Sequence, residues 1–381
     1  MLERFEIHVS DADVDDLRRR LQATRLPGDL ANDDWRYGTS RAYLQDFLTA
    51  WRDDYDWRAH ERAMNAYTHY RVALSGQNLH FLHVPCPGGL PLLLVGGWPQ
   101  TFWDFADVLP LLEGFELVVP DLPGHGFSTP LHGPGTGFIQ TADMFHHLMT
   151  EVLGHRRYGI YGMDWGALIG EQLAHKHPDV VCGLHTSMPV PLGWSPAERR
   201  RDPAQWTPEE QSRRDAADEQ VTRGSGYLHM QTTRPQTVAY LIDSPAATAA
   251  WLIDRVHAWT DHGGQLNDAY PLERLLTTVS LYWFTGTLAT AARFYAESAS
   301  QGWQPVSTRQ PVIPVPTAVA AYPKEGGAYP RKWVEQYFNL DRYTVMERGG
   351  HFPPVENPKS LGTDIARFFH DLDKRTAARN G

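Results

Sequence analysis

The stretch that most constrains this chain runs from residue 159 to residue 170 and reads GIYGMDWGALIG. An apolar run enters a Gly-x-Asp-x-Gly turn, which is typical of a sharp turn from a strand into a helix. Gly162 and Gly166 stand where neighbouring backbone passes close to such a turn. In the common version the middle residue is a nucleophilic Ser, but here it is Asp164. An Asp before a helix can also be a simple N-cap; the flanking glycines and the preceding strand favour a nucleophile.

Short apolar runs alternate with helical stretches around this turn. Residues 91–97, 115–128 and 156–163 read as buried strands that end in turns, and strand character returns at 312–323 and 342–350. Strands that alternate with helices at this spacing predict an α/β architecture with a mostly parallel sheet.

The organisation along the chain predicts four parts. Residues 1–75 form a leader without a reactive constellation, and residues 76–194 form the first part of the α/β core. Residues 195–304 are mostly polar, helical and rich in Trp, Tyr and Arg, so we expect an inserted helical cap. Residues 305–381 complete the core.

Composition excludes several classes of function. The formal net charge of −10 argues against a nucleic-acid-binding surface. Only two cysteines occur, Cys86 and Cys182, which favours two free thiols in a reducing compartment. The N-terminal residues lack the pattern of a signal peptide, and no run of 18 apolar residues is present. We therefore expect a cytoplasmic protein without a membrane anchor.

A histidine and a carboxylate late in the chain could complete a catalytic set. His351 lies in RGGHFPP, after a strand and before the final helix, and Glu325 lies in YPKEGG at the end of the preceding strand. Hydrolases of the α/β type place nucleophile, acid and histidine in this order. Either residue alone would be read as an ordinary surface or turn residue. The order favours His351 as the base and Glu325 as the acid that orients it.

The turn GGWPQ at residues 96–100 predicts an oxyanion hole. We expect the backbone N–H groups of Trp98 and Trp165 to form it, and these two residues with Pro99 to line the substrate pocket. The glycine-rich loop at residues 121–128 would shape the site without reacting.

Several histidines could suggest a metal site, namely His146, His147, His175 and His177. None of them has the ligand spacing of a known motif. The sequence therefore predicts neither a metal nor a cofactor.

Taken together, the chain resembles the microsomal-type epoxide hydrolases, which open epoxides to vicinal diols. The resemblance runs through nearly the whole chain and rests on the segments VSDADVDDLRRRLQATRLP, DWRYG, YDWRAHE, HFLHV, GMDWG, SGYLHMQTTRPQT, LYWFTGT, RFY, YPKE and RGGHF. It implies an α/β-hydrolase fold, with a mostly parallel, doubly wound sheet, an inserted cap and an N-terminal meander.

The resemblance also implies roles for individual residues. Asp164 matches the family's nucleophile, Glu325 its acid and His351 its base. Tyr227 and Tyr295 match the two cap tyrosines that hold the epoxide oxygen, whereas their sequence context alone would make them packing aromatics. One departure concerns the oxyanion turn, where the family usually has His-Gly-x-Pro and this chain begins with Gly96. A backbone donor survives that change, but a supporting side chain is lost.

The reaction expected from this set is a two-step hydrolysis with an epoxide and water as the only partners. An aspartate is ionised at neutral pH, so it can attack an epoxide carbon without a base. The tyrosines would assist the leaving oxygen, and the histidine would activate water to hydrolyse the resulting ester. A homodimer is expected by analogy alone.

Two alternatives remain open at this stage. A haloalkane dehalogenase also uses an Asp nucleophile, and the indole of Trp165 could then bind the halide. A non-catalytic ligand-binding relative would explain Gly96 but would not need a complete Asp, Glu and His set. A serine esterase is disfavoured because no Ser occupies the turn. The expected substrate is a bulky apolar epoxide, such as a natural-product intermediate, and the cap contains tryptophans that could enclose it: Trp206, Trp251, Trp259, Trp283 and Trp303.

Overall fold

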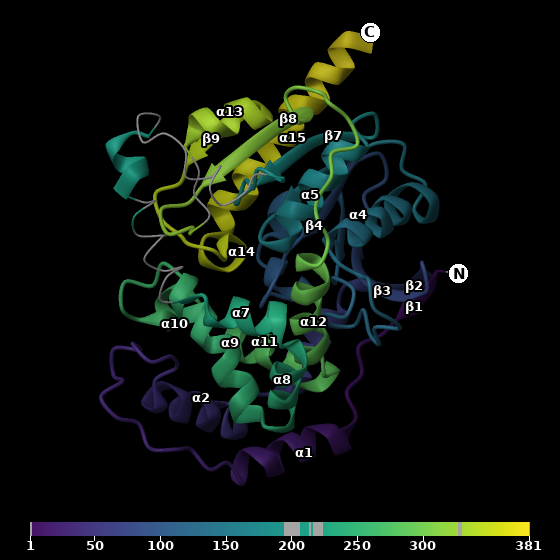
Figure 1. Cartoon of the computed structure of the whole chain (residues 1–381). Helices are drawn as coiled ribbons and strands as arrows, with labels where there is room; N and C mark the ends of the chain where they lie inside the picture. Colours follow the sequence, from purple (N-terminus) through teal and green to yellow (C-terminus); the bar gives the residue numbers. More distant parts are fainter. Residues whose placement is uncertain (1, 194–205, 213–214, 216–223, 327–329, 381) are drawn as a thin grey trace.

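A nine-stranded sheet forms the centre of the molecule (Figure 1). The computed structural model describes residues 2–193, 206–212, 215, 224–326 and 330–380. The strands lie in the order β1-β2-β3-β5-β4-β6-β7-β8-β9. Their bounds are β1 (Glu3–Phe5), β2 (Thr68–Leu74), β3 (Gln77–Val84), β4 (Leu90–Val95), β5 (Phe115–Pro120), β6 (Tyr158–Gly162), β7 (Val181–Thr186), β8 (Ile313–Ala321) and β9 (Phe338–Val345).

The sheet is parallel over most of its width. Strands β5, β4, β6, β7, β8 and β9 run parallel, whereas β1, β2 and β3 add an antiparallel edge. The predicted α/β class with a mostly parallel sheet is therefore confirmed. The sequence reading did not identify β7, because Cys182, Gly183 and His185 interrupt its apolar pattern.

Helices cover both faces of the parallel part. On one face lie α4 (Phe138–His147), which continues as η3 (Leu148–Val152), and α5 (Trp165–Lys176). On the other face lie α15 (Pro358–Asn380) and the short helices η1 (Phe102–Phe105) and η2 (Leu109–Leu112). Alternate residues of β4 enter the two cores, as expected for a strand buried on both faces. Two further helices are α13 (Arg331–Tyr337) and α14 (Pro353–Glu356).

A group of helices between β7 and β8 lies at one end of the sheet (Figure 1). It comprises α7 (Gly226–Thr233), α8 (Pro235–Ala239), η6 (Tyr240–Asp243), α9 (Pro245–Trp259), α10 (Leu266–Ala269), α11 (Leu272–Thr285) and α12 (Leu288–Ala299). These helices lie within the predicted cap, of which residues 195–205, 213–214 and 216–223 are outside the described part of the chain. The bounds of the four predicted parts remain a prediction.

The N-terminal leader contains α1 (Asp11–Gln22), α2 (Arg41–Asp53) and α3 (Trp57–Asn65). Its helices α1 and α2 lie on the side of the helices between β7 and β8 that faces away from the sheet, whereas β1 and β2 belong to the sheet (Figure 1). Leu44, Phe47 and Trp51 of α2 are buried in a cluster with apolar residues of α9 and α11. The amphipathic stripe of this helix thus attaches the leader to the cap. Among the described helices, none combines the length and the apolar character needed to span a bilayer.

Candidate active site

The turn between β6 and α5 presents Asp164 in a backbone conformation that is rare for a residue with a side chain. Its φ is 51° and its ψ is −126°. A Cβ atom at Gly162 would overlap the carbonyl group of residue 166, and one at Gly166 would overlap the carbonyl oxygen of Val95. Both glycines are therefore required by close backbone contacts, as the sequence reading expected.

Two groups from distant segments approach the Asp164 carboxylate. The backbone N–H of Trp98 donates a hydrogen bond to Oδ1 at 2.7 Å. Nε2 of His351 lies 3.4 Å from Oδ2. A Cβ atom at Gly97 would overlap this carboxylate, so the oxyanion turn can approach it only with a glycine at that position. Asp164 thus faces a backbone donor on one oxygen and an imidazole on the other.

The imidazole of His351 lies between two carboxylates. Nδ1 is 2.8 Å from Oε2 of Glu325, and the other ring nitrogen faces Asp164. Glu325 is buried, with 7% of its surface exposed. Burial by itself lowers the pKa of His351, but Glu325 and Asp164 outweigh it and raise the pKa to about 10. In the free protein the three side chains therefore form a carboxylate–imidazolium–carboxylate set.

An aromatic enclosure surrounds this set. The ring of Tyr227 stacks on Trp98 at 5.4 Å between centroids, and the ring of Tyr295 meets Trp98 edge-on at 5.9 Å. The two tyrosine rings are 6.1 Å apart. Trp165 contacts Tyr295 at 4.8 Å, and Trp259 contacts Tyr227 at 5.1 Å. Residues from the core and from α7, α9 and α12 thus meet beside the β6–α5 turn.

Burial strongly affects both tyrosine hydroxyls. It raises the pKa of Tyr227 and of Tyr295, and the negative charge of Asp164 raises both further. The hydroxyls are therefore neutral hydrogen-bond donors at physiological pH. Contact with Trp165 opposes the rise for Tyr295.

The remaining predicted positions are also near the turn. Pro99 is buried and directly follows Trp98. The amide of Trp165 is the first in α5, where an N–H has no partner within its own helix. Of the five cap tryptophans, Trp259 lies against the site, and its ring is 4.9 Å from that of His351. The other four contact residues elsewhere: Trp206 with Trp333, Trp251 with Gln231, Trp283 with Arg20, and Trp303 with Gln172.

Comparisons with known proteins agree with this geometry. The sequence profile described as "Epoxide hydrolase N terminus" matches residues 2–105, and the profile described as "alpha/beta hydrolase fold" matches residues 91–239. Epoxide hydrolase 1 of Oryctolagus cuniculus is 33% identical over 403 residues, covering 96% of this chain and 88% of the relative. The chain belongs to the epoxide hydrolase family.

Other members of the epoxide hydrolase family extend the agreement. The juvenile hormone epoxide hydrolase of Manduca sexta is 32% identical, covering 95% of this chain and 84% of the relative. The crystal structure of the corresponding protein of the silkworm Bombyx mori superposes with a TM-score of 0.88 at 29% identity, covering 99% of this chain and 96% of that one. The Aspergillus niger epoxide hydrolase gives 0.85 at 26% identity, covering 98% and 97%. The α/β-hydrolase fold and the predicted resemblance are both confirmed.

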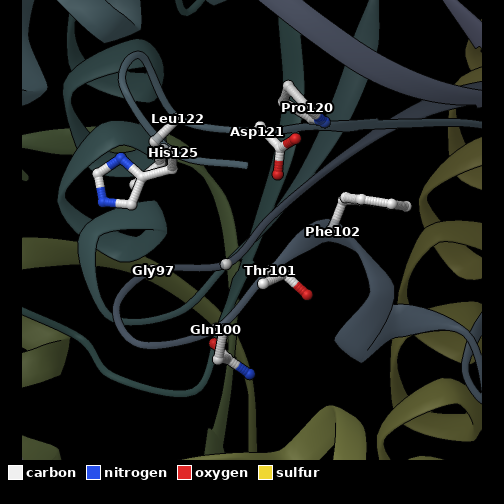
Figure 2. A pocket seen from close by; sticks show the side chains of 9 residues that line it. Gly97, Gln100, Thr101, Phe102, Pro120, Asp121, Leu122 and His125 are labelled. Atoms are coloured by element: carbon white, nitrogen blue, oxygen red, sulfur yellow. The ribbon is translucent and has the colours of Figure 1, made fainter. Parts of the chain in front are cut away.

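The turn after β4 begins with Gly96, where the resemblance implied a histidine. Figure 2 shows the small cavity beside it, which is lined by the turn after β4 and the loop after β5. The volume of this cavity is about 10 Å³, which is roughly the room for one water molecule. The side chain of Gln100 is 3% exposed, and its Oε1 is 3.3 Å from where a Cβ at Gly96 would lie. Gln100 therefore fills part of the space next to Gly96.

The loop at residues 121–128 contributes His125 to the same cavity. His125 is 3% exposed, and burial lowers its pKa to about 4, so its imidazole is neutral at physiological pH. Its ring meets Phe294 edge-on at 5.4 Å. The loop shapes the cavity wall behind the oxyanion turn.

Three of the four histidines that could suggest a metal site have other contacts. The rings of His146 and His177 stack at 3.6 Å, and His175 interacts with the backbone of Val312 and Val306. Within the described residues, no group of three or more His, Cys, Asp or Glu side chains is arranged to hold a metal ion.

Two polar residues near His351 escaped the sequence reading. Glu356 accepts hydrogen bonds from the amides of Gly350 and Phe352, and Asp261 accepts one from the amide of Gly349. Glu356 lies four residues after the segment RGGHF. A carboxylate this close in sequence to the candidate base His351 is the only sequence signal that could have identified it. Asp261 is 90 residues from His351 in sequence, so only the fold relates them.

Proposed function

We propose that this chain hydrolyses an epoxide to a vicinal diol, with Asp164 as the nucleophile. The observation that carries the proposal is the position of the Asp164 carboxylate, with the Trp98 amide 2.7 Å from one oxygen and the imidazole of His351 3.4 Å from the other. Membership of the epoxide hydrolase family supports the same reaction.

In the first step, an oxygen of Asp164 attacks an epoxide carbon and the carbon–oxygen bond of the ring breaks. The product is an alkyl ester on the enzyme, and the displaced oxygen becomes an alkoxide that needs a proton. Tyr227 and Tyr295 are the groups proposed to assist it, because both hydroxyls are buried, protonated and close to the nucleophile turn.

In the second step, His351 acts as a base that the first step has prepared. Esterification removes the negative charge of Asp164, which is one of the two charges that raise the pKa of His351. The pKa therefore falls when the ester forms, and the imidazole can accept a proton from water. Water attacks the ester carbonyl carbon while the amides of Trp98 and Trp165 stabilise the oxyanion. The diol leaves with an oxygen from Asp164.

The substrate proposed for this site is bulky and apolar. The rings that approach the nucleophile are Trp98, Trp165, Tyr227, Trp259 and Tyr295, which offer a largely apolar surface with two hydroxyl donors. Such a lining favours an epoxide flanked by aryl, lipid or terpenoid groups over a small polar one. Natural-product intermediates belong to this class.

A single turnover in ¹⁸O-labelled water tests the mechanism. Enzyme in excess over substrate is mixed with styrene oxide, trans-stilbene oxide or 9,10-epoxystearate, and the diol and the Asp164 peptide are analysed by mass spectrometry. The ester route places ¹⁸O in Asp164 and none in the first diol. Label that enters the diol directly in the first turnover, with none in Asp164, would show that water opens the ring and that the ester route is wrong.

One observation favours a second candidate function. In the described part of the chain, the indole nitrogens of Trp98 and Trp165 are buried and make no hydrogen bond of good geometry. Two such donors near an Asp nucleophile could bind a halide released from a haloalkane. Chloride release from 1-chlorobutane without diol formation from any epoxide of the panel would favour this dehalogenase, and no turnover of either class would favour a binding protein.

A further inference from the structure

The backbone around His351 is held by hydrogen bonds from every one of its amides. Residues 349–352 precede α14, and each of their four N–H groups has an acceptor outside the segment. Glu356 supplies two of these acceptors. Its Oε2 accepts from Gly350 at 2.8 Å, and its Oε1 accepts from Phe352 at 2.7 Å. The carboxylate therefore holds the amides of the residue before and the residue after His351.

The other two acceptors come from the end of the cap helix α9. The carbonyl of Trp259 accepts from the amide of His351 at 2.9 Å, and the carboxylate of Asp261 accepts from Gly349 at 3.0 Å. Glu356 also reaches this segment, because the amide of Asp261 donates to its Oε2 at 2.7 Å. One carboxylate thus joins the loop that carries the imidazole to the end of a cap helix.

We propose that Glu356 is a positioning residue that holds the imidazole of His351 in place for the ester-hydrolysis step. It does so by fixing the position of the loop 349–352 relative to residues 259–261. This inference rests on the proposed function. Asp164 is positioned by the β6–α5 turn, which Glu356 does not contact. Loss of Glu356 therefore affects the step that uses the base and spares the attack of the nucleophile.

The surroundings of Glu356 restrict the movement of its side chain. Burial raises the pKa of its carboxyl group to about 7, and the three amide donors and the charge of His351 oppose that rise. A carboxylate that accepts three backbone N–H groups away from water has fixed geometry, because each donor would lose its partner if the side chain moved. Gln at this position has a single acceptor oxygen in place of two, so it can retain some of these hydrogen bonds.

Rapid-quench experiments with Glu356→Gln and Glu356→Ala test this role. Enzyme is mixed with styrene oxide, or with another epoxide of the panel above if that reacts faster. The alkylated Asp164 peptide is then quantified against time. We expect ester hydrolysis to slow by about 10-fold in Glu356→Gln and by about 100-fold in Glu356→Ala, out of the 10²–10⁴-fold that a general base typically supplies. Alkylation should stay within about 2-fold of the unsubstituted enzyme, because no amide that Glu356 holds belongs to the nucleophile turn.

Asp364→Asn is the matched control. Asp364 is also a buried carboxylate near the C-terminus, but it contacts His185, Arg342 and Thr344 instead of the loop 349–352. It should lower the thermal unfolding temperature and leave both rates within about 2-fold. If Glu356→Ala does not fold, Glu356→Gln alone decides the test.

The outcomes separate this inference from the proposed function. Alkylated Asp164 that is hydrolysed at the unsubstituted rate in Glu356→Gln overturns the positioning role alone. Equal slowing of both steps also overturns it, because it would indicate a general loss of structure. If no alkylated peptide forms in any variant, His351→Gln included, the proposed function itself is wrong.

Discussion

Two of the buried histidines that have carboxylate partners, His351 and His80, differ in a decisive way in their surroundings. His351 bonds Glu325 through Nδ1 and directs Nε2 at Asp164. His80 bonds Asp121 through Nδ1, but its Nε2 is 3.0 Å from Nδ1 of a second histidine, His69. Both imidazoles are buried and both have a charged partner. The difference lies in what the second ring nitrogen faces.

Counting protons along the second network defines its state. Nε2 of His69 lies 2.9 Å from the carbonyl of Met64, which can only accept, so its Nδ1 must accept from His80. His80 therefore donates through Nε2, and its Nδ1 lies 2.8 Å from Oδ2 of Asp121. Burial, followed by the neighbouring His80, lowers the pKa of His69 to about 4, in agreement with a neutral ring. This hydrogen-bond network connects β2, β3 and the loop after β5. We therefore interpret it as a structural network that stabilises the fold.

The comparison shows that a histidine paired with a carboxylate is not by itself evidence for a base. In the described residues His351 differs because its second nitrogen faces a side chain whose charge changes during the proposed reaction. The predictions below test whether one network serves chemistry and the other stability.

The largest effect is expected from Asp164→Ala. Loss of the proposed nucleophile should lower kcat for epoxide hydrolysis by at least about 10⁴-fold, because neither step has another route on the enzyme. The variant should remain folded, since Ala keeps the backbone of the turn and removes only the contacts of the carboxylate with the Trp98 amide and His351. Steady-state diol formation and circular dichroism measure the two properties, and residual activity above about 1% would contradict the assignment.

Asp121→Asn is expected to lower the stability of the protein and to leave the rate of Asp164 alkylation almost unchanged. Replacing the carboxylate disrupts the buried hydrogen bonds that Oδ2 makes with Nδ1 of His80 and with the amide of Phe127. A buried polar group left without its partner typically costs about 1–3 kcal/mol of unfolding free energy. The rate of Asp164 alkylation should change little, because the network does not contact the nucleophile. Urea unfolding and rapid-quench kinetics give the two values. A large loss of alkylation in a protein of unchanged stability would show that the networks are not separate in function.

The pH dependence of stability tests the charge of His351. The folded-state pKa of His351 is about 10, above its ordinary value of 6.5. Its contribution to stability is therefore fully present below pH 6.5 and is lost as the pH rises towards 10. We expect the difference in unfolding free energy between the unsubstituted protein and His351→Gln to shrink by about 4 kcal/mol across this window, because each pKa unit corresponds to about 1.4 kcal/mol. Urea titrations at pH 6 and pH 10 would show a constant difference if the imidazole were neutral throughout.

The smallest effect is expected from Gly96→Ala. The added Cβ would lie 3.3 Å from Oε1 of Gln100 and 3.5 Å from the ring of Phe105, so a small shift of the amide accommodates it. Stability should change by less than about 1 kcal/mol and kcat by less than about 3-fold. A loss of 100-fold or more would mean that the oxyanion turn depends on the space at Gly96.

Sequence patterns predicted the layers of this protein and the residues that the fold brings together at the turn. The β6–α5 turn could be predicted because close backbone contacts require its two glycines, and these glycines are visible as a short sequence motif. The contacts of Asp164 with His351 and of His351 with Glu325 were expected from chain order and from resemblance. Their catalytic roles remain proposals.

Other features had no local signature. Strand β7 was missed because its buried Gly183 and His185 are explained only by neighbours, with His185 bonding Asp364 from α15. The network of His69, His80 and Asp121 joins residues from three segments that pattern analysis treats independently. Of the five cap tryptophans, nothing in sequence singled out Trp259 as the one against the site. Each of these depends on tertiary contacts, which spacing along one element does not encode.

The left-handed backbone of Asp164 has a consequence for engineering this protein. A non-glycine residue at φ 51° and ψ −126° typically carries about 1–3 kcal/mol of conformational energy. Glycine would adopt the same turn with less strain, although Asp164→Gly also removes the contacts of the carboxylate with Trp98 and His351. A selection for heat resistance alone therefore does not protect the proposed nucleophile. Libraries built from this scaffold need an activity screen at every round, because the substitution that relieves strain at this turn also removes the proposed nucleophile.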